Sequence, residues 1–489
     1  MTPDARGARS APGGHGHAVV IGSSLAGLTA ARALAGFMDH VTVVERDWLP
    51  RGPGRRPGVP QARHPHRLVD DAHRGLERLF PGIGEDLERA GALRLRLPRD
   101  MLLLGPAGWL PRHDSGLLAY SAGRDLLDTV IRDRLRGDPR VTFLTRHEAV
   151  GLHGGPHDSV TGVWVRRRER AAPDAPGARR LLSAQFVVDA SGRASRAPRW
   201  LTELGYQTPR QSVASTGTRQ VSTLYAPPLG HVGDFTGLQI TPAPGDRRSA
   251  LLTPVEGGRW AVTLTTGAGQ PPPAGHRELL AAAAALRDPL LHRLIAPATP
   301  LGPLYTAHGE SRWRHYEQLR RWPEGFLVLG DAFVALDPAH GHGMTLAVHS
   351  ALVLEHLLHA HGTPTGIGYR LRRALAHQLA PAWRAHTRPP GRGPRARYAQ
   401  RLAAAARTDR HAAAWLLRRA DGLEPPGALG PRTLLAALHG APGAGPGAPP
   451  SATHGARDAR PRPAAPARTP APGPPTPRQA ANTRSIRGS

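Results

Sequence analysis

The chain has 489 residues, a length that predicts about two to three domains with a large hydrophobic core. It contains no cysteine, which excludes disulfides, thiolate metal sites and a cysteine nucleophile. All 64 basic residues are arginine and the formal net charge is +27, but the arginines are scattered and aromatic residues make up only 5% of the chain. A nucleic-acid interface gathers basic residues on one face among aromatics, so we expect no specific nucleic-acid partner.

The two ends of the chain differ in composition from the rest. Residues 1–16 are rich in Gly, Ala and Pro, and residues 440–489 consist mainly of Pro, Ala, Gly, Arg and Thr. Such segments bury too little apolar surface to offset the entropy of ordering, so both are predicted to be disordered. The N-terminus lacks the apolar core of a signal peptide, and no apolar stretch is long enough to cross a membrane. We therefore expect a soluble, cytoplasmic protein without a membrane span.

Residues 17–47 have the pattern of a dinucleotide-binding βαβ unit. The apolar periodicity predicts a strand at 17–21, a turn at 22–27, a helix over 28–36 and a second strand at 41–44. Gly22 permits a sharp turn, and the small Ser23, Ser24 and Gly27 let backbone N–H groups approach a pyrophosphate at the positive end of the helix dipole. Glu45 can accept hydrogen bonds from a ribose hydroxyl. The segment therefore predicts a site for a ligand that contains adenosine diphosphate.

Two other interpretations of this turn remain open, because Ser24 stands where the usual motif has its middle glycine. The segment can be a tight turn in another kind of α/β protein. It can also be a nucleophile elbow in which Ser24 attacks an ester. The elbow is the weaker alternative, because it belongs in the middle of a hydrolase sheet and this turn follows the first strand of the chain.

Further elements follow from the periodicity along the chain. We predict helices ending near 80 and over 121–136, 277–295 and 344–359, a helical segment within 393–438, and strands at 141–144, 160–166, 185–188, 249–254, 259–265 and 326–329. Residues 219–265 are rich in Val, Thr, Leu and turn residues, which favours antiparallel pairing.

A second motif occupies residues 330–346, where a buried strand runs into an Asp turn and a Pro/Gly loop that opens a helix. Asp331 at the strand end can hold a polyol hydroxyl. The backbone N–H groups of residues 341–345 form a positively polarised helix start that suits a delocalised anion. Alone, the pattern predicts only a turn and a loop; after the upstream βαβ unit it indicates a second part of the same nucleotide site.

Together these motifs resemble the FAD-binding core of the group A flavoprotein monooxygenases, the para-hydroxybenzoate hydroxylase-like superfamily. The resemblance rests on GSSLAG at 22–27 with Glu45, and on GDAFVALDPAHGHG at 330–343. A bacterial branch described as FAD-dependent oxidoreductases is matched further by PGVPQARH at 57–64, VVDASGRASR at 187–196 and RWPEGFLVLGD at 321–331. The similarity extends over residues 17–438.

The resemblance implies an α/β (α+β) fold: a Rossmann-like FAD-binding domain with an inserted, mostly antiparallel β-sheet substrate domain and a helical C-terminal extension. The expected boundaries are 17–205 and 321–375 for the two parts of the FAD-binding domain, 206–320 for the substrate-binding sheet and 376–439 for the extension.

The resemblance also implies cofactor contacts for individual residues. Gly22, Ser23 and Gly27 would cradle the FAD pyrophosphate, Glu45 would hold the adenosine ribose, and Arg124 would reach the FAD backbone. Asp331 would bind the ribityl chain, while Pro338, Gly341, Gly343 and Met344 would lie beside the isoalloxazine. Ser24 and Arg46 complete the expected cofactor-binding set.

The implied activity is a monooxygenase that hydroxylates or epoxidises a small organic substrate, such as a secondary metabolite. NAD(P)H would reduce the flavin, and O₂ would form the C4a-hydroperoxide that transfers oxygen. The alternatives are an FAD-dependent dehydrogenase or reductase without oxygen insertion, and a non-catalytic FAD-binding protein. No catalytic side chain is predicted, because the cofactor carries the chemistry. The sequence gives no indication of oligomeric state.

The sequence departs from the family at one position and leaves several histidines unassigned. Ser191 stands where the family has an aspartate directly before glycine, and the carboxylate is Asp189 instead, which puts direct NADPH binding in question. The halogenase segment Trp-x-Trp-x-Ile-Pro is absent. Two His-x-His pairs, at 64/66 and 340/342, lack further ligands at metal-site spacing, so no metal site is predicted. His64 and His342 can either contact flavin or substrate, or be ordinary satisfied histidines.

Overall fold

A computed structural model describes residues 16–168, 178–231, 233–361, 365–387, 393–422 and 447–450. The predicted disordered ends, apart from residues 16 and 447–450, and residues 423–438 of the predicted C-terminal helical segment lie outside these ranges. All elements below belong to one unit of the chain, residues 1–452.

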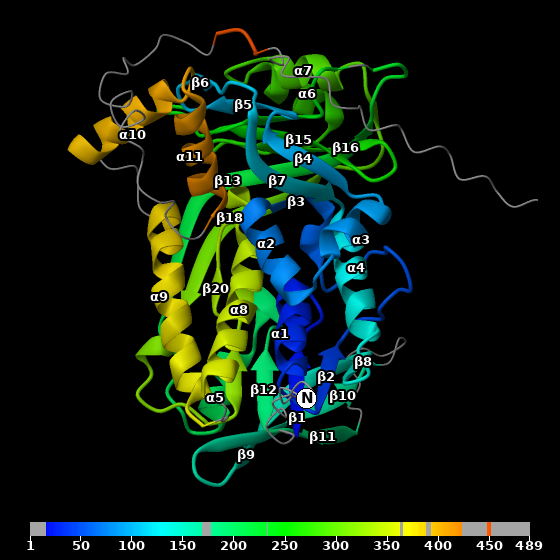
Figure 1. Cartoon of the computed structure of the whole chain (residues 1–489), viewed down its shortest axis with the longest axis vertical. Helices are drawn as coiled ribbons and strands as arrows, with labels where there is room; N and C mark the ends of the chain where they lie inside the picture. The colour runs from blue at the N-terminus through cyan, green and yellow to red at the C-terminus, as the bar shows by residue number, and fades with distance from the viewer. Residues whose placement is uncertain are drawn as a thin grey trace, which may run out of the picture. The chain divides into compact units, whose positions relative to one another are not determined.

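A parallel sheet contains the strands of the predicted βαβ unit (Figure 1). Its described strands, in order across the sheet, are β19 (Phe326–Val328), β12 (Phe186–Asp189), β1 (His17–Ile21), β2 (His40–Glu45) and β8 (Val141–Thr145). In register, Val19 lies opposite Val187 on one side and Thr42 on the other. These strands are almost entirely buried, as expected for a parallel sheet covered on both faces. The predicted strands at 17–21, 41–44, 141–144, 185–188 and 326–329 are confirmed.

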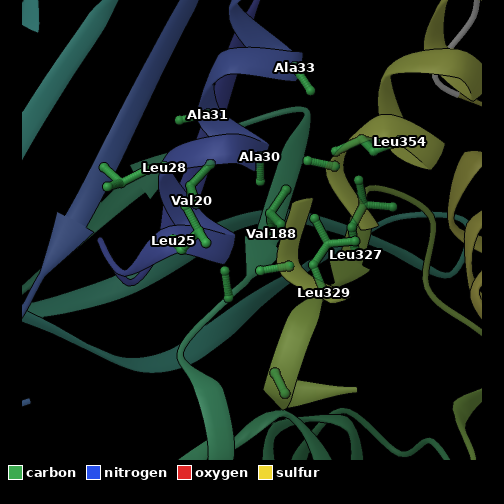
Figure 2. Packing of buried hydrophobic residues seen from close by; sticks show 14 of the residues in the cluster. Val20, Leu25, Leu28, Ala30, Ala31, Ala33, Val188, Leu327, Leu329 and Leu354 are labelled. Carbon is green, nitrogen blue, oxygen red and sulfur yellow. The ribbon is translucent and has the colours of Figure 1, made fainter. Parts of the chain in front are cut away.

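Helices pack on one face of this sheet and on one another. They are α1 (Leu25–Ala35), α2 (Asp70–Leu79), α3 (Ile83–Arg89), α4 (Arg124–Arg136), α8 (Gly343–His361) and α9 (Ile367–Thr387). α1 packs against α4 and α8, and Figure 2 shows the side chains of Ala30, Val188, Leu327 and Leu354 gathered in one cluster with those of α1. α2 approaches α8 so closely that a Cβ on Gly75 would lie 2.5 Å from Val348. The predicted βαβ unit at 17–47 and the much later helix α8 therefore share one hydrophobic core.

A smaller antiparallel sheet lies against the same strands. It consists of β9 (His147–Gly155), β10 (Ser159–Arg167) and β11 (Arg179–Ser183). β10 packs against β12, and β9 against β2. A short helix, α5 (Ala197–Glu203), follows β12.

The predicted antiparallel region forms a large, mostly antiparallel sheet, which confirms the expected fold class. Its described strands, in order, are β20 (Val334–Ala335), β18 (Tyr305–Arg314), β13 (Gln211–Ala226), β16 (Arg259–Thr265), β15 (Ser249–Val255), β14 (Gly237–Ile240), β5 (Met101–Gly105) and β6 (Gly108–Trp109), with β17 (Thr299–Pro300) beside β13. Only the pairing of β5 with β14 is parallel among these described strands. β5, β6 and β20 come from outside residues 206–320, so the sheet draws on three separate parts of the chain.

Two helices, α6 (His276–Ala284) and α7 (Leu290–Ile295), pack on this sheet through one apolar cluster (Figure 1). The prediction of one continuous helix over 277–295 is wrong. The helix is interrupted before Pro289, which cannot continue an upstream helix because its ring clashes with the preceding turn.

A third sheet joins β3 (His66–Val69), β7 (Asp114–Ala122) and β4 (Leu93–Pro98). The predicted start of a helix at 121 is wrong, because residues 121–122 end β7 and α4 begins at Arg124. The Ser121 hydroxyl lies 2.7 Å from that of Thr253 and donates to the Pro254 carbonyl, which fixes this strand end against β15.

The C-terminal helices α10 (Pro394–Ala405) and α11 (Arg410–Asp421) pack on β4, β5 and β7 (Figure 1). Leu402, Ala406, Ala412 and Ala413 enter one apolar cluster with Leu103 and other residues of these strands. In the part of the chain that the structure describes, no helix combines the length and apolarity needed to cross a membrane.

Candidate functional site

A cavity of about 1170 Å³ lies between the carboxyl ends of the parallel strands and the large sheet. This volume exceeds the ~300–1,000 Å³ of pockets for drug-sized ligands, so the cavity has room for a dinucleotide and a second molecule. Most of the expected cofactor-binding residues line it: Gly22, Ser23, Ser24, Glu45, Arg46, Arg124, Asp331, Pro338, Gly341, Gly343 and Met344. Gly27 lies behind the cavity wall, in the first turn of α1.

The turn after β1 needs its two glycines for different reasons. Gly22 has φ +100°, a conformation that L side chains rarely adopt, and a Cβ there would lie 2.8 Å from the Ala190 carbonyl oxygen. Gly27 has ordinary helical geometry, but a Cβ there would lie 1.8 Å from the Gly22 carbonyl oxygen. The first glycine allows the turn, and the second allows α1 to pack directly against it.

Position 24 does not require a glycine, because the backbone angles of Ser24, φ −84° and ψ 179°, are unstrained extended values. Its hydroxyl does not cap α1 but accepts a hydrogen bond of 2.9 Å from Arg124 Nη2. The first turn of α1 contains no acidic residue, and residues 24–26 line the cavity. The backbone N–H groups that a helix start leaves unpaired therefore face the cavity without a capping side chain, as an anion site requires. The relaxed backbone argues against the strained turn of a nucleophile elbow.

Buried charges connect this turn to α4. Glu45 Oε2 accepts from the Ser23 backbone N–H at 3.0 Å and from Arg56 Nη1 at 3.3 Å. Arg56 Nη2 pairs with Asp128 at 2.8 Å, and Asp128 also accepts from Arg124 Nε at 2.8 Å. Two carboxylates and two guanidiniums thus neutralise each other beside the cavity, which compensates for the cost of burying them. Glu45 Oε1 accepts from the Asp47 backbone N–H at 2.9 Å and retains capacity for a further donor such as a ribose hydroxyl.

The sequence analysis did not identify three buried charged residues that support the site, Asp128, Arg56 and Arg314. Asp128 follows Arg124 by four residues on a helix, a spacing that could have identified the pair. Arg56 lies in a Pro/Arg-rich loop that carries no periodic signal. Arg314, buried on β18, donates to the carbonyls of Ala332 at 3.0 Å and Arg193 at 2.6 Å, and so joins the two loops that flank Asp331.

Asp331 lies in the short turn that follows β19. Gly330 has φ +59°, and a Cβ there would lie 2.7 Å from that of Ala26, so this turn packs against the start of α1. The Asp331 side chain is about one-third exposed to the cavity and pairs with Arg193 Nε at 3.4 Å. Burial raises the pKa of Asp331, and the nearby Arg193 opposes that shift.

Asp189, the carboxylate two residues before the position where the family has its aspartate, does not line the cavity. Asp189 is fully buried and accepts from the Ser191 backbone N–H at 2.9 Å and from the hydroxyls of Ser191 and Ser195 at 2.5 Å each. Burial raises the pKa of Asp189, and these donors oppose the shift. Ser191 itself lines the cavity. Asp189 therefore holds the loop that carries Ser191 and Arg193.

The loop before α8 is fixed from both sides. Asp337 accepts from the Ala339 backbone N–H at 2.9 Å and from the Thr216 hydroxyl at 2.8 Å. Gly341 has φ +72°, and α8 begins two residues later at Gly343. The start of this long helix faces the cavity with Met344, which places a positively polarised end there.

Three histidines of the His-x-His pairs line the cavity: His64, His66 and His342. His64 Nδ1 lies 2.7 Å from the Ser222 hydroxyl, and His342 Nε2 lies 2.7 Å from the Ala420 carbonyl oxygen. Burial lowers the pKa of His66 to about 3 and, with the neighbouring His386, that of His342 to about 4. Burial also lowers the pKa of His64, so all three are neutral near pH 7. Within the described ranges, no cluster of three or more potential ligand side chains could hold a metal ion.

The opposite end of the cavity is lined by the large sheet and the end of α11. Gln239 of β14, Leu251 of β15 and Thr263 of β16 meet Arg67 of β3 there, and Asp421 enters from the end of α11. Arg67 Nη2 donates to Gln239 Oε1 at 2.9 Å. Sequence reasoning missed Arg67 and Asp421, because their proximity depends on how α11 packs.

A sequence comparison identifies a relative of this chain. No protein-family model matches the chain. Protein Rv3254 of Mycobacterium tuberculosis is 33% identical over 381 residues, which cover 75% of this chain and 78% of that protein.

Solved structures share the fold at low sequence identity. The flavin-dependent brominase Bmp2, as a triple mutant, has a TM-score of 0.56 at 14% identity and covers 79% of this chain and 88% of its own. PqsL, a probable FAD-dependent monooxygenase from Pseudomonas aeruginosa, has a TM-score of 0.54 at 17% identity, covering 80% and 97%. The 2-methyl-3-hydroxypyridine-5-carboxylic acid oxygenase has a TM-score of 0.54 at 18% identity, covering 76% and 90%. The chain therefore belongs to the family of protein Rv3254 and has the fold of the para-hydroxybenzoate hydroxylase-like flavoprotein monooxygenases.

Proposed function

We propose that the chain is an FAD-dependent monooxygenase that acts on a small organic substrate, with NAD(P)H as reductant and O₂ as co-substrate. The observation that carries the proposal is the cavity, which brings the turn after β1, the start of α4 and the 331–344 loop together against the large sheet. The first and last of these segments are more than 300 residues apart in sequence, and each of the three contributes a group suited to a different part of a dinucleotide.

The residues present fit FAD. The uncapped start of α1 offers backbone N–H groups to the pyrophosphate, because Gly27 lets that helix approach the turn at Gly22. Glu45 would hold the adenosine ribose, with Arg46 beside it on the cavity wall. Asp331 would bind the ribityl hydroxyls, and residues 338–344 would lie along the ring system. The FAD-binding part would then comprise residues 17–205 and 321–375, apart from β5, β6 and β20, which belong to the large sheet.

When bound, FAD would supply hydride acceptance from NAD(P)H and activation of O₂. The chain would contribute orientation and electrostatics. The start of α8 would stabilise negative charge on the ring edge beside Gly343 and Met344. Neutral His64 and His342 would bring no competing positive charge to this region. Leu251, Leu304 and Leu336, which line the cavity, would limit its water content.

A small-molecule substrate is supported by the cavity volume, and by the structure of PqsL with 2-aminobenzoylacetate, a protein of the same fold. We further propose that the protein acts in the cytoplasm on a secondary metabolite. A gene neighbourhood without biosynthetic enzymes would argue against that role.

The first test is the absorbance spectrum of the purified protein, with the released flavin identified after denaturation. We expect two flavin bands and FAD in the supernatant. NADPH and NADH are then added anaerobically, and air is readmitted. Bleaching that reverses with oxygen and consumes O₂ supports the monooxygenase.

Other outcomes discriminate between the alternatives. Reduction that O₂ reverses slowly, while an organic acceptor reverses it quickly, would indicate a dehydrogenase or reductase. FAD that neither NADPH nor NADH bleaches would favour a dehydrogenase or a separate partner reductase. Firm retention of FAD without any turnover would support a non-catalytic FAD-binding protein. A colourless protein that cannot be reconstituted with FAD would rule the proposal out.

A further inference from the structure

The end of α11 places an acidic residue in an unfavourable environment. Asp421 is the last residue of that helix, where the negative end of the helix dipole disfavours a carboxylate. Its Oδ2 is buried and accepts no hydrogen bond from any residue that the structure describes. Burial raises the pKa of Asp421 to about 6, Arg67 opposes the shift, and Asp70 and Asp71 add to it. Such a placement costs stability, so folding alone does not account for it.

Contacts at both ends of α11 hold this helix in place. One residue before Asp421, the Ala420 carbonyl oxygen lies 2.7 Å from His342 Nε2. At the other end of α11, the Asp409 side chain accepts from the backbone N–H groups of His411 and Ala412. Between these points, Ala412 and Ala413 are fully buried against the strands below. The helix therefore delivers Asp421 to the cavity beside the loop that precedes α8.

Arg67 is the cationic counterpart at this end of the cavity. Two of its nitrogens are used, by Gln239 Oε1 at 2.9 Å and by Met101 Sδ at 3.3 Å. Its Nε is buried and has no hydrogen-bond partner among the described residues. Arg67 and Asp421 attract one another but form no direct ion pair in the described part of the chain. Both side chains line the cavity, and each keeps hydrogen-bonding capacity that no described residue uses.

We propose that Asp421 and Arg67 form a specificity site for a neutral substrate group that donates one hydrogen bond and accepts another, namely a hydroxyl or a carboxamide. This inference rests on the proposed function, because it concerns the substrate end of the same cavity. The donor of such a group satisfies the carboxylate, and its acceptor satisfies the guanidinium. The pair carries no net charge, so a carboxylate or an ammonium group would leave one buried charge unbalanced.

The test uses four probes with one ring system: 2-naphthol, 2-naphthamide, 2-naphthoate and 2-naphthylmethylamine. Their dissociation constants are measured by calorimetry at neutral pH on the flavin-loaded protein. We expect the two neutral probes to bind about tenfold more tightly than the two charged ones. The comparison of 2-naphthol with 2-naphthamide shows whether the site prefers a hydroxyl or a carboxamide.

Two variants should shift the preference in opposite directions. Asp421→Asn leaves Arg67 uncompensated and should shift the preference toward naphthoate by about tenfold. Arg67→Gln keeps a donor for Gln239 and should shift the probe preference toward 2-naphthylmethylamine by a similar factor. Asp133→Asn, on the exposed part of α4 and outside the cavity, is the matched control and should leave all four constants unchanged.

Several results would overturn the inference. They are an unchanged order of affinities in both variants, an equal loss for all four probes, a loss of FAD instead of a change in probe binding, and no binding of any probe to the wild-type protein. Circular dichroism and the melting temperature show whether a variant is folded. If the protein retains no flavin, the proposed function fails, yet the titrations of the flavin-free protein still decide whether Asp421 and Arg67 discriminate between the probes.

Discussion

Arg124 Nη2 donates a hydrogen bond of 2.9 Å to Ser24 Oγ, and this contact joins the start of α4 to the start of α1 across 100 residues of sequence. Ser24 stands where a glycine is usual, but its extended backbone does not require one. The serine therefore supplies an acceptor that glycine lacks. It ties the turn of the proposed pyrophosphate site to the buried pairs of Arg124 and Arg56 with Asp128.

Arg124→Ala should destabilise the protein and weaken FAD binding together. The substitution leaves Asp128 with Arg56 alone and removes the donor to Ser24. Breaking a buried charge pair from one side costs about 3–5 kcal/mol. We expect a loss of that size in the free energy of unfolding by urea, and a rise in the dissociation constant of FAD.

Arg136→Ala is the control for that substitution, because Arg136 lies on the same helix and pairs with Asp133 at 3.0 Å on the surface. A surface ion pair contributes about 0–1 kcal/mol, so this variant should remain close to wild type. Equal effects of the two substitutions would show that the buried network has no special role.

Gly27→Ala should disrupt the contact between α1 and the turn after β1. The added Cβ would lie 1.8 Å from the Gly22 carbonyl oxygen, and backbone cannot yield as a flexible side chain does. We expect a loss of more than about 3 kcal/mol, or failure to fold, because overpacking of this severity exceeds the usual 1–3 kcal/mol. The measurement is the melting temperature together with the flavin content.

Gly36→Ala provides the matched comparison at the other end of α1. Gly36 has φ −75°, and a Cβ there would lie 3.5 Å from the Ala33 carbonyl oxygen, an ordinary contact. Alanine should be neutral or stabilise by about 0.4–1 kcal/mol. A Gly27 variant as stable as this one would contradict the close packing of α1 on the turn.

The parts of the site that could be predicted from the sequence depend on local geometry. The turn at Gly22, the packing at Gly27 and the carboxylate at Asp331 each follow from a strand, a short motif and a helix that are adjacent in sequence. Their spacing alone fixes where the backbone N–H groups and the carboxylate lie relative to the strand ends.

The remaining features depend on contacts between distant segments. β5 pairs in parallel with β14, so that Leu102 lies opposite Leu238, and no local pattern records that pairing. Asp421 reaches the cavity because α11 packs on strands formed more than 290 residues earlier. Arg56 belongs to an irregular loop whose arginines are indistinguishable in sequence. Residues of this kind are identified only when the packing is known.

Stability should rise with pH between about 4 and 6.5, and His342 should contribute to that slope. Burial, followed by the neighbouring His386, lowers the pKa of His342 to about 4, whereas the unfolded chain has about 6.5. The unfolded state therefore binds more protons in this window, so the stability present above pH 6.5 is lost as the pH falls toward 4. The shift corresponds to about 3 kcal/mol.

His342→Gln tests this slope, because the amide can still donate to the Ala420 carbonyl while it does not titrate. Urea unfolding is measured from pH 4 to pH 7.5 for both proteins. We expect the difference in unfolding free energy between wild type and variant to shrink as the pH falls. Parallel curves would assign the pH dependence to other groups, such as His66, whose pKa burial lowers to about 3.

Ala413→Glu should detach the C-terminal helices from the strands that they cover. Ala413 is fully buried between α11 and β4, β5 and β7, so a carboxylate there has no partner and no room. Since the expected pyrophosphate and ribose contacts lie at the other end of the cavity, the variant should still bind FAD. We expect faster proteolysis within residues 393–422 and weaker binding of the naphthalene probes.

The exposed His411 lies on the same helix, and His411→Glu introduces the same charge without burying it. This control should resist protease like the wild type and bind the probes equally well. Comparing the two variants separates the effect of burying the new carboxylate from the effect of its charge alone. If Ala413→Glu bound the probes as tightly as His411→Glu, the end of α11 would not form part of the substrate site. If both variants lost FAD, the C-terminal helices would contribute to the cofactor site itself.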